Sequence, residues 1–97
     1  MASYQEQAEQ MILKENANAV LLEGIESALL GYVNLWGGGS VAVYDSVMVV
    51  KILMKKNNIS AEQALSYFQS QIDSKYMGPN TPLFLLRPVE DSILAEW

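Results

Sequence analysis

The chain has 97 residues and a net charge of −5, and it contains neither Cys nor His. The missing residue types exclude disulfides, a Ser-His or Cys-His catalytic pair, and a zinc site built from thiolates and imidazoles. The acidic balance argues against nucleic acid as a partner, because binding a phosphate backbone needs clustered Lys and Arg. We therefore expect no cofactor and no metal.

Length and hydropathy predict one cytoplasmic domain. A chain of this size forms a single core, so we expect residues 1–97 to fold together, with residues 87–97 as a C-terminal tail or short helix. No apolar run reaches the ~18 residues of a membrane span, and the N-terminus lacks the form of a signal peptide. We therefore expect no contact with a membrane.

The first helix is predicted over residues 4–16. Ser3 and Glu6 have the spacing of a capping box, in which the Ser hydroxyl accepts from an amide of the first turn and the Glu side chain reaches back. The apolar residues that follow recur at helical spacing on one face, namely Tyr4, Ala8, Met11 and Ile12.

The segment from residue 17 to residue 44 is rich in Val, Leu, Tyr and Trp, and Gly punctuates it. We interpret it as three strands joined by turns, at residues 20–23, 29–36 and 41–44. The alternative is one helix over residues 17–32, because helical spacing also fits Leu21, Leu22, Ile25 and Leu29. The Gly-rich turn after Trp36 runs into a strand, which predicts a hairpin and not a phosphate-binding loop.

A helix over residues 47–56 follows, capped by Asp45 or Ser46. It is apolar on nearly every side, so it lies in the centre of the domain or is covered by a second subunit. We expect self-association, as a homodimer or a larger oligomer, through residues 47–54. These residues carry more apolar surface than a chain of 97 residues easily covers.

The C-terminal part predicts one more helix and one more strand. Ser60 and Gln63 form a second capping box, which begins a helix over residues 61–73. Pro82 and Pro88 suit the two ends of a strand over residues 83–86. The order of helix, three strands, two helices and strand predicts the α+β class, with a small antiparallel sheet of about four strands packed against two to three helices.

Four stretches in this order resemble a family of small uncharacterised proteins of phages and bacterial genomes: LLEGIESALLGYV, VAVYD, SAEQALSYFQSQI and YMGPNTPLF. The resemblance covers about Leu21 to Phe84. Similar sequences tend to carry Asn where this chain has Gln71, and they often stop soon after the last strand. The resemblance implies a fold and a phage-like origin, and therefore the cytoplasm of a host cell. It implies no activity.

Seven residues are our candidates for contact with a ligand or partner: Tyr44, Asp45, Tyr67, Gln71, Tyr76, Asn80 and Thr81. Asp45 either caps a helix or stands beside amides that could bind an anion. Tyr67 and Tyr76 either pack in the protein or wall a pocket, since aromatic rings with polar tips serve both purposes. Asn80 and Thr81 are polar groups that the turn into the last strand leaves unused.

These observations favour a non-catalytic phage-type binding protein, an inhibitor or sequestering protein that acts on a host protein or a small signal molecule. One alternative is a structural or assembly protein of a virion. The other is a small hydrolase that relies on carboxylates, which would need Asp45, Glu23 or Glu26 to converge in one pocket. Glu23 and Glu26 could also hold a hard cation, but the sequence offers no third ligand.

Overall fold

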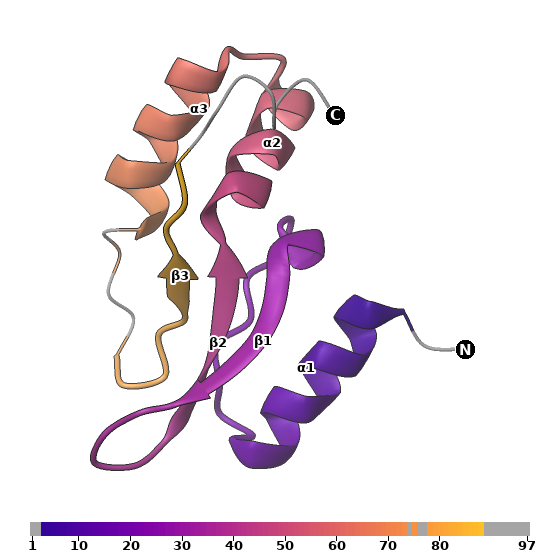
Figure 1. The fold of residues 1–97 in the computed structure, drawn as a ribbon, viewed down its shortest axis with the longest axis vertical. Coiled ribbons are helices and arrows are strands. Elements are labelled where there is room, and N and C mark those ends of the chain that lie inside the picture. The colour runs from indigo at the N-terminus through magenta and orange to yellow at the C-terminus, as the bar shows by residue number, and fades with distance from the viewer. Residues whose placement is uncertain (1–2, 74, 76–77, 89–97) are drawn as a thin grey trace.

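The computed structural model describes residues 3–73, 75 and 78–88, and Figure 1 shows their arrangement. The helices are α1 (Tyr4–Glu15), α2 (Ser46–Asn57) and α3 (Ala61–Tyr67), and the strands are β1 (Leu29–Asn34), β2 (Ser40–Asp45) and β3 (Leu83–Leu85). A short 3-10 helix, η1 (Glu26–Ala28), precedes β1, and a π-helix, η2 (Phe68–Asp73), continues α3. The α+β class is therefore confirmed.

The sheet has the order β1-β2-β3, with β1 antiparallel and β3 parallel to β2. The part of the chain that the structure describes thus forms a mixed sheet of three strands, where we predicted about four antiparallel strands. Strand β2 runs directly into α2, so α2 and α3 lie beyond one end of the sheet, while α1 packs beside β1 (Figure 1). The predicted tail lies outside the described residues except for its first two, Arg87 and Pro88.

The predicted strand at residues 20–23 is absent, and so is the alternative helix over residues 17–32. The backbone of this segment bonds to distant groups instead. The amide of Val20 donates to the carbonyl of Asn80 at 3.2 Å, and the amide of Leu22 donates to the hydroxyl of Tyr44 at 2.8 Å. Gly24 then turns the chain with a φ of 90°, a positive value that glycine adopts without steric cost. This backbone conformation would interrupt a helix.

The hairpin between β1 and β2 is confirmed. Its tip closes with a bond from the amide of Leu35 to the carbonyl of Gly39 at 2.9 Å. Three consecutive glycines, Gly37–Gly39, adopt positive φ there. A bulge lies between Leu29 and Gly31, and the hydroxyl of Tyr4 donates to the carbonyl of Leu30 in it. The bond ties the first turn of α1 to the strand beside it.

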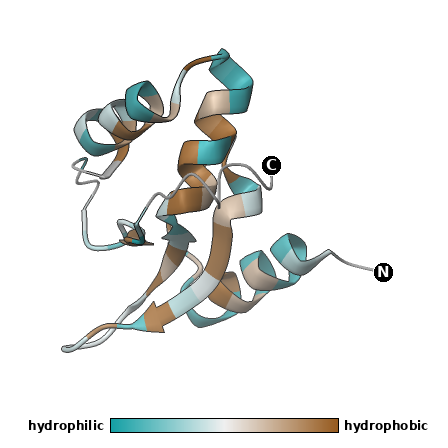
Figure 2. Ribbon diagram, turned by 45° about the horizontal axis from the view of Figure 1, so that its top comes forward, coloured by the Kyte–Doolittle hydropathy of each residue, from teal (hydrophilic) through white to brown (hydrophobic). Residues whose placement is uncertain are grey.

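Helix α2 is covered by the rest of its own chain. Asp45 caps its N-terminus, and Asn58 ends it in the left-handed conformation with φ 51°. Its buried side chains are Ser46, Val47, Val49, Val50 and Leu53, and its partly buried Met48, Ile52 and Met54 pack against the core. Figure 2 shows α2 hydrophobic through most of its length and hydrophilic at its C-terminal end. The prediction that residues 47–54 leave excess apolar surface for a second subunit is therefore wrong.

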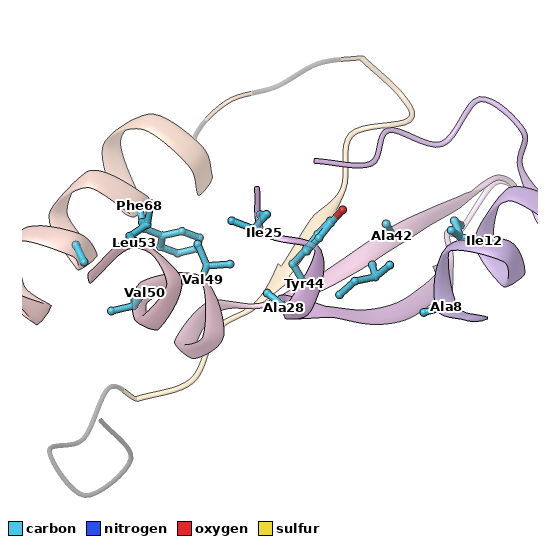
Figure 3. Close-up of a cluster of buried hydrophobic side chains, with 12 residues drawn as sticks. Ala8, Ile12, Ile25, Ala28, Ala42, Tyr44, Val49, Val50, Leu53 and Phe68 are labelled. Atoms are coloured by element: carbon cyan, nitrogen blue, oxygen red, sulfur yellow. The ribbon is translucent and has the colours of Figure 1, made fainter. Parts of the chain in front are cut away.

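The core runs from the sheet to the helices. Figure 3 shows Ala8 and Ile12 of α1 at one end, Tyr44 and Ile25 in the middle, and Val49, Leu53 and Phe68 at the other end. Phe84 of β3 joins these parts. Its ring lies 5.1 Å from that of Phe68, edge to face, and 5.9 Å from that of Tyr44. The parallel strand thus links Tyr44 of the sheet to Phe68 of η2.

The predicted helix over residues 61–73 changes its winding halfway. The capping box of Ser60 and Gln63 is present with both bonds, at 3.1 Å each. From Phe68 onward the helix widens to the π form. A π segment inside a helix shifts the direction of the side chains that follow, and such segments are frequent at functional sites.

Candidate functional site

Asp45 lies at the junction of β2 and α2, where its carboxylate is fully used. One oxygen accepts from the amide of Val47 at 3.3 Å. The guanidinium of Arg87 donates to both oxygens, from Nε to Oδ1 at 2.8 Å and from a terminal nitrogen to Oδ2 at 2.5 Å. The amide of Arg87 also donates to the hydroxyl of Ser46 at 3.0 Å. This bidentate ion pair joins the segment after β3 to the start of α2.

Tyr44 is buried, and its hydroxyl accepts from the amide of Leu22. Burial raises the pKa of Tyr44 above its usual value, the bond to Leu22 works in the opposite direction, and the nearby charges of Glu9 and Glu26 raise the pKa further. The neutral phenol is therefore favoured in the folded protein. Its place in the core makes it a support for residues 20–23 (Figure 3).

Asn80 and Thr81 also have partners inside the chain. The side-chain oxygen of Asn80 accepts from the amide group of Asn16 at 2.9 Å, and the same amide group donates to the carbonyl of Ser40. The hydroxyl of Thr81 donates to the carbonyl of Gly78 at 2.5 Å. These bonds close the turn before β3 and tie it to the end of α1. Tyr76 lies outside the described residues.

Tyr67 and Gln71 lie on a surface groove. The groove consists of two neighbouring clefts, of about 480 Å³ and about 210 Å³, which share Glu23, Ile25 and Ile72. Tyr67 lines the larger cleft and Gln71 the smaller one. The walls are residues 22–25 on one side, the C-terminal half of α2 at the end, and α3 with η2 on the other side. Tyr67 and Gln71 are thus the two candidates that the fold brings to one site.

The groove has an apolar floor and a polar rim. The floor is formed by aliphatic side chains that are buried or half-buried: Leu22, Ile25, Ile52, Leu53, Ile59 and Ile72. The rim carries exposed polar side chains: Glu23, Lys56, Asn57, Tyr67, Gln71 and Lys75. This is the usual composition of a small-molecule site, in which apolar surface supplies affinity and a few polar groups fix orientation.

Most of the rim groups are uncommitted within the described part of the chain. Asn57 donates to the carbonyl of Leu53 at 3.2 Å. The side chains of Tyr67, Gln71, Lys56 and Lys75 make no hydrogen bond or ion pair with any residue that the structure describes. Their donors and acceptors face solvent and are open to a ligand, in contrast to those of Asp45 and Asn80.

Glu26 and Lys56 shape one end of the groove. The carboxylate of Glu26 accepts from the amide of Gly24 at 3.0 Å. That bond is the main cause that lowers the pKa of Glu26, with a bond to its own amide next and a smaller contribution from the charge of Lys56. A Cβ on residue 24 would lie 3.2 Å from the Lys56 ammonium nitrogen. Gly24 therefore lets the ammonium group lie close against the loop.

A smaller cleft of about 240 Å³ lies on the other side of α3, lined in part by Leu65, Phe68 and Leu86. Its polar groups include Ser46 and Arg87, which already bond to each other, and Arg87 also pairs with Asp45. Among residues 3–73, 75 and 78–88, no group of three or more acidic side chains could hold a metal ion. Glu23 and Glu26 thus find no third acidic ligand there.

Sequence reasoning missed the lysines and the floor of the groove. Neither Lys56 nor Lys75 was among the candidate residues. Ile25 belonged to the helical spacing within residues 17–32, but nothing local shows that Ile25 and Ile72 line the same groove. One available signal was the lack of an acidic residue four positions before Lys56, which leaves this helical lysine without an ion-pair partner on that side.

Comparison with known proteins leaves the chain without an assigned relative. None of the described helices is long and apolar enough to cross a membrane. The chain matches none of the family models, curated proteins or solved structures with which it was compared.

Proposed function

We propose that this chain is a small non-catalytic binding protein that sequesters a small molecule in the groove formed by residues 22–25, α2, α3 and η2. The observation that carries the proposal is the groove itself, with an aliphatic floor and a rim of uncommitted polar side chains. Its larger cleft, of about 480 Å³, falls within the range of small-molecule sites.

The internal bonding of two reactive candidates favours sequestration over catalysis. The hydroxyl of Tyr44 and the carboxylate of Asp45 are both bonded inside the fold. The hydrolase alternative needs Asp45 to converge with Glu23 or Glu26, but Glu23 lines the groove and Asp45 does not. With the phage-like resemblance, we extend the proposal to a protein that removes a signal molecule in the cytoplasm of a host cell.

The proposal is tested by recovering the ligand from host extract. Purified protein is incubated with a small-molecule extract of host cells, isolated, denatured, and analysed by mass spectrometry. We expect one compound at a stoichiometric ratio to the protein. The variant Tyr67→Ala/Gln71→Ala should recover much less of it, while Gln10→Ala/Met11→Ala, a pair of exposed sites on α1, should recover the same amount.

Two results would contradict the proposal. One is conversion of a compound over many cycles per protein molecule, which would indicate an enzyme. The other is equal recovery by the groove variant and the α1 variant, which would place binding elsewhere. Abundance of the chain in purified virions would instead support the structural alternative.

A further inference from the structure

The charges around the groove indicate which kind of molecule it holds. We infer that the ligand is an organic anion of drug size, with an apolar body on the aliphatic floor and one acidic group paired with Lys56. This inference rests on the proposed function and adds the chemical class of the ligand. Its basis is the placement of Lys56 and Lys75 in a chain that is acidic as a whole.

The described lining of the groove is richer in basic residues than the chain as a whole. The protein has eleven acidic and six basic residues. Among the lining residues that the structure describes, Lys56 and Lys75 are basic and Glu23 is acidic, and the charge of Glu26 acts on Lys56 from beside the groove. At physiological ionic strength, charges farther than about 8 Å are largely screened, so a bound molecule interacts mainly with the charges that line its site.

Lys56 has the geometry to receive the acidic group. Its ammonium lies against the backbone of Gly24, at the edge of the larger cleft. It has no ion pair with any described residue, and Glu26, whose charge acts on it, is itself bonded to the amide of Gly24. An acidic ligand group would therefore find a lysine whose donors are not taken by a carboxylate of the protein.

The aliphatic floor and the ring of Tyr67 indicate that the rest of the ligand is apolar. Ile52, Ile59 and Ile72 offer branched aliphatic surface without hydrogen-bonding groups. Tyr67 is 51% exposed, so one part of its ring is available for contact. A strongly hydrated inorganic ion would leave this apolar surface uncovered, whereas an apolar body with a single acidic group would use both features.

Two fluorescent probes with nearly the same body test the inference. Anilinonaphthalene sulfonate is an apolar anion, and phenylnaphthylamine is its neutral counterpart. Each is titrated into the wild type and into Lys56→Gln and Lys14→Gln. Lys14 is an exposed lysine in the last turn of α1 and serves as the matched control. Amide chemical-shift changes at residues 22–25 and 71–72 locate the bound probe.

We expect the sulfonate to bind more tightly than the neutral probe and to shift the groove amides. The change Lys56→Gln should weaken binding of the sulfonate about fivefold, the upper range for an ion pair at a partly exposed site. Lys14→Gln should have no effect, and neither substitution should alter binding of the neutral probe. Added salt should weaken binding of the sulfonate only, which provides a readout independent of any variant.

The failures are distinguishable. If both probes shift the groove amides with equal affinity and without dependence on Lys56, the inferred charge is wrong and the proposed binding function stands. If neither probe shifts those amides, the inference and the proposed function both fall.

Discussion

Polar side chains occur both at the junction between β2 and α2 and at the groove beside α3. At the junction they are hydrogen-bonded within the chain, and at the groove most of them are not. At the junction, Asp45 accepts from Val47 and from Arg87, and each of its oxygens is bonded. At the groove, the side chains of Tyr67 and Gln71 make no hydrogen bond with any residue that the structure describes. Residues of the first kind hold distant parts of the chain together, and residues of the second kind are open to an outside molecule. The two regions can be separated by mutation, because the first should affect stability and the second should affect binding.

The largest effect is expected at the junction. Asp45→Ala removes a helix cap and the two-pronged partner of Arg87, and should lower the free energy of unfolding by about 2 kcal/mol. Arg87→Ala should cost less, about 1 kcal/mol, because its side chain is 41% exposed and solvent weakens the ion pair. Urea unfolding followed by circular dichroism measures both variants and the double variant. If the two effects are additive, Arg87 does not stabilise the fold through Asp45.

Tyr44→Phe comes next. It keeps the ring and leaves the amide of Leu22 without an acceptor, so we expect a loss of about 1.5 kcal/mol. Tyr67→Phe is the control, because the hydroxyl of Tyr67 has no partner within the described residues, and it should change stability little.

The raised pKa of Tyr44 predicts how the stability of the fold changes at alkaline pH. The pKa of Tyr44 is higher in the folded protein than in the unfolded chain. The contribution of its neutral hydroxyl is therefore complete below the unfolded pKa of about 10, and it is lost as the pH rises through the folded pKa. Thermal unfolding between neutral pH and pH ~11 should show this loss in the wild type and less of it in Tyr44→Phe. An equal loss in both proteins would assign the effect to other groups.

A smaller effect is expected at the turn before β3. Asn80→Ala removes the bond to the side chain of Asn16, and the backbone carbonyl of residue 80 can still accept from Val20. The expected cost is about 1 kcal/mol, measured by urea unfolding. Asn18→Ala is the control, since the side chain of Asn18 is exposed and makes no bond with the described residues. Equal stability of the two variants would show that Asn80 does not hold the turn.

The smallest effect on stability, together with the largest on binding, is expected at the groove. Tyr67→Ala/Gln71→Ala should change the free energy of unfolding by less than about 0.5 kcal/mol, because both side chains are exposed. The same change should weaken ligand binding about tenfold, the usual scale for loss of an aromatic anchor. Calorimetric titration with the recovered compound provides the measurement. A large loss of stability without a loss of binding would reverse the roles of the two regions.

Local chemistry was sufficient to predict much of the fold. The capping box at Ser60, the cap at Asp45 and the glycine hairpin each depend on residues a few positions apart, and each is present. Residues 20–23 were misassigned because their partners, Asn80 and Tyr44, are distant in sequence. The two prolines predicted that β3 exists, but its parallel pairing with β2 depends on where two intervening helices bring the chain.

The same limit, local information without distant partners, applies to the candidate site. Residue type alone could suggest Tyr67, Gln71, Asp45 and Asn80 as candidates. It could not show which of them are bonded internally, because those bonds span long stretches of sequence, 64 residues for Asn80 and Asn16. The groove likewise depends on bringing together Ile25 and Ile72, which the hairpin and α2 separate in the sequence.

The parallel pairing of β3 with β2 sets an order of events during synthesis. Arg87 leaves the ribosome 42 residues after the aspartate it pairs with, and Phe84 likewise emerges well after Tyr44 and Phe68. Until Phe84 emerges, the rings of Tyr44 and Phe68 lack the side chain that packs against both, so the nascent chain exposes aromatic surface that is prone to aggregate. A product released before residue 83 would keep that surface indefinitely and should be a preferred target for chaperones and proteases.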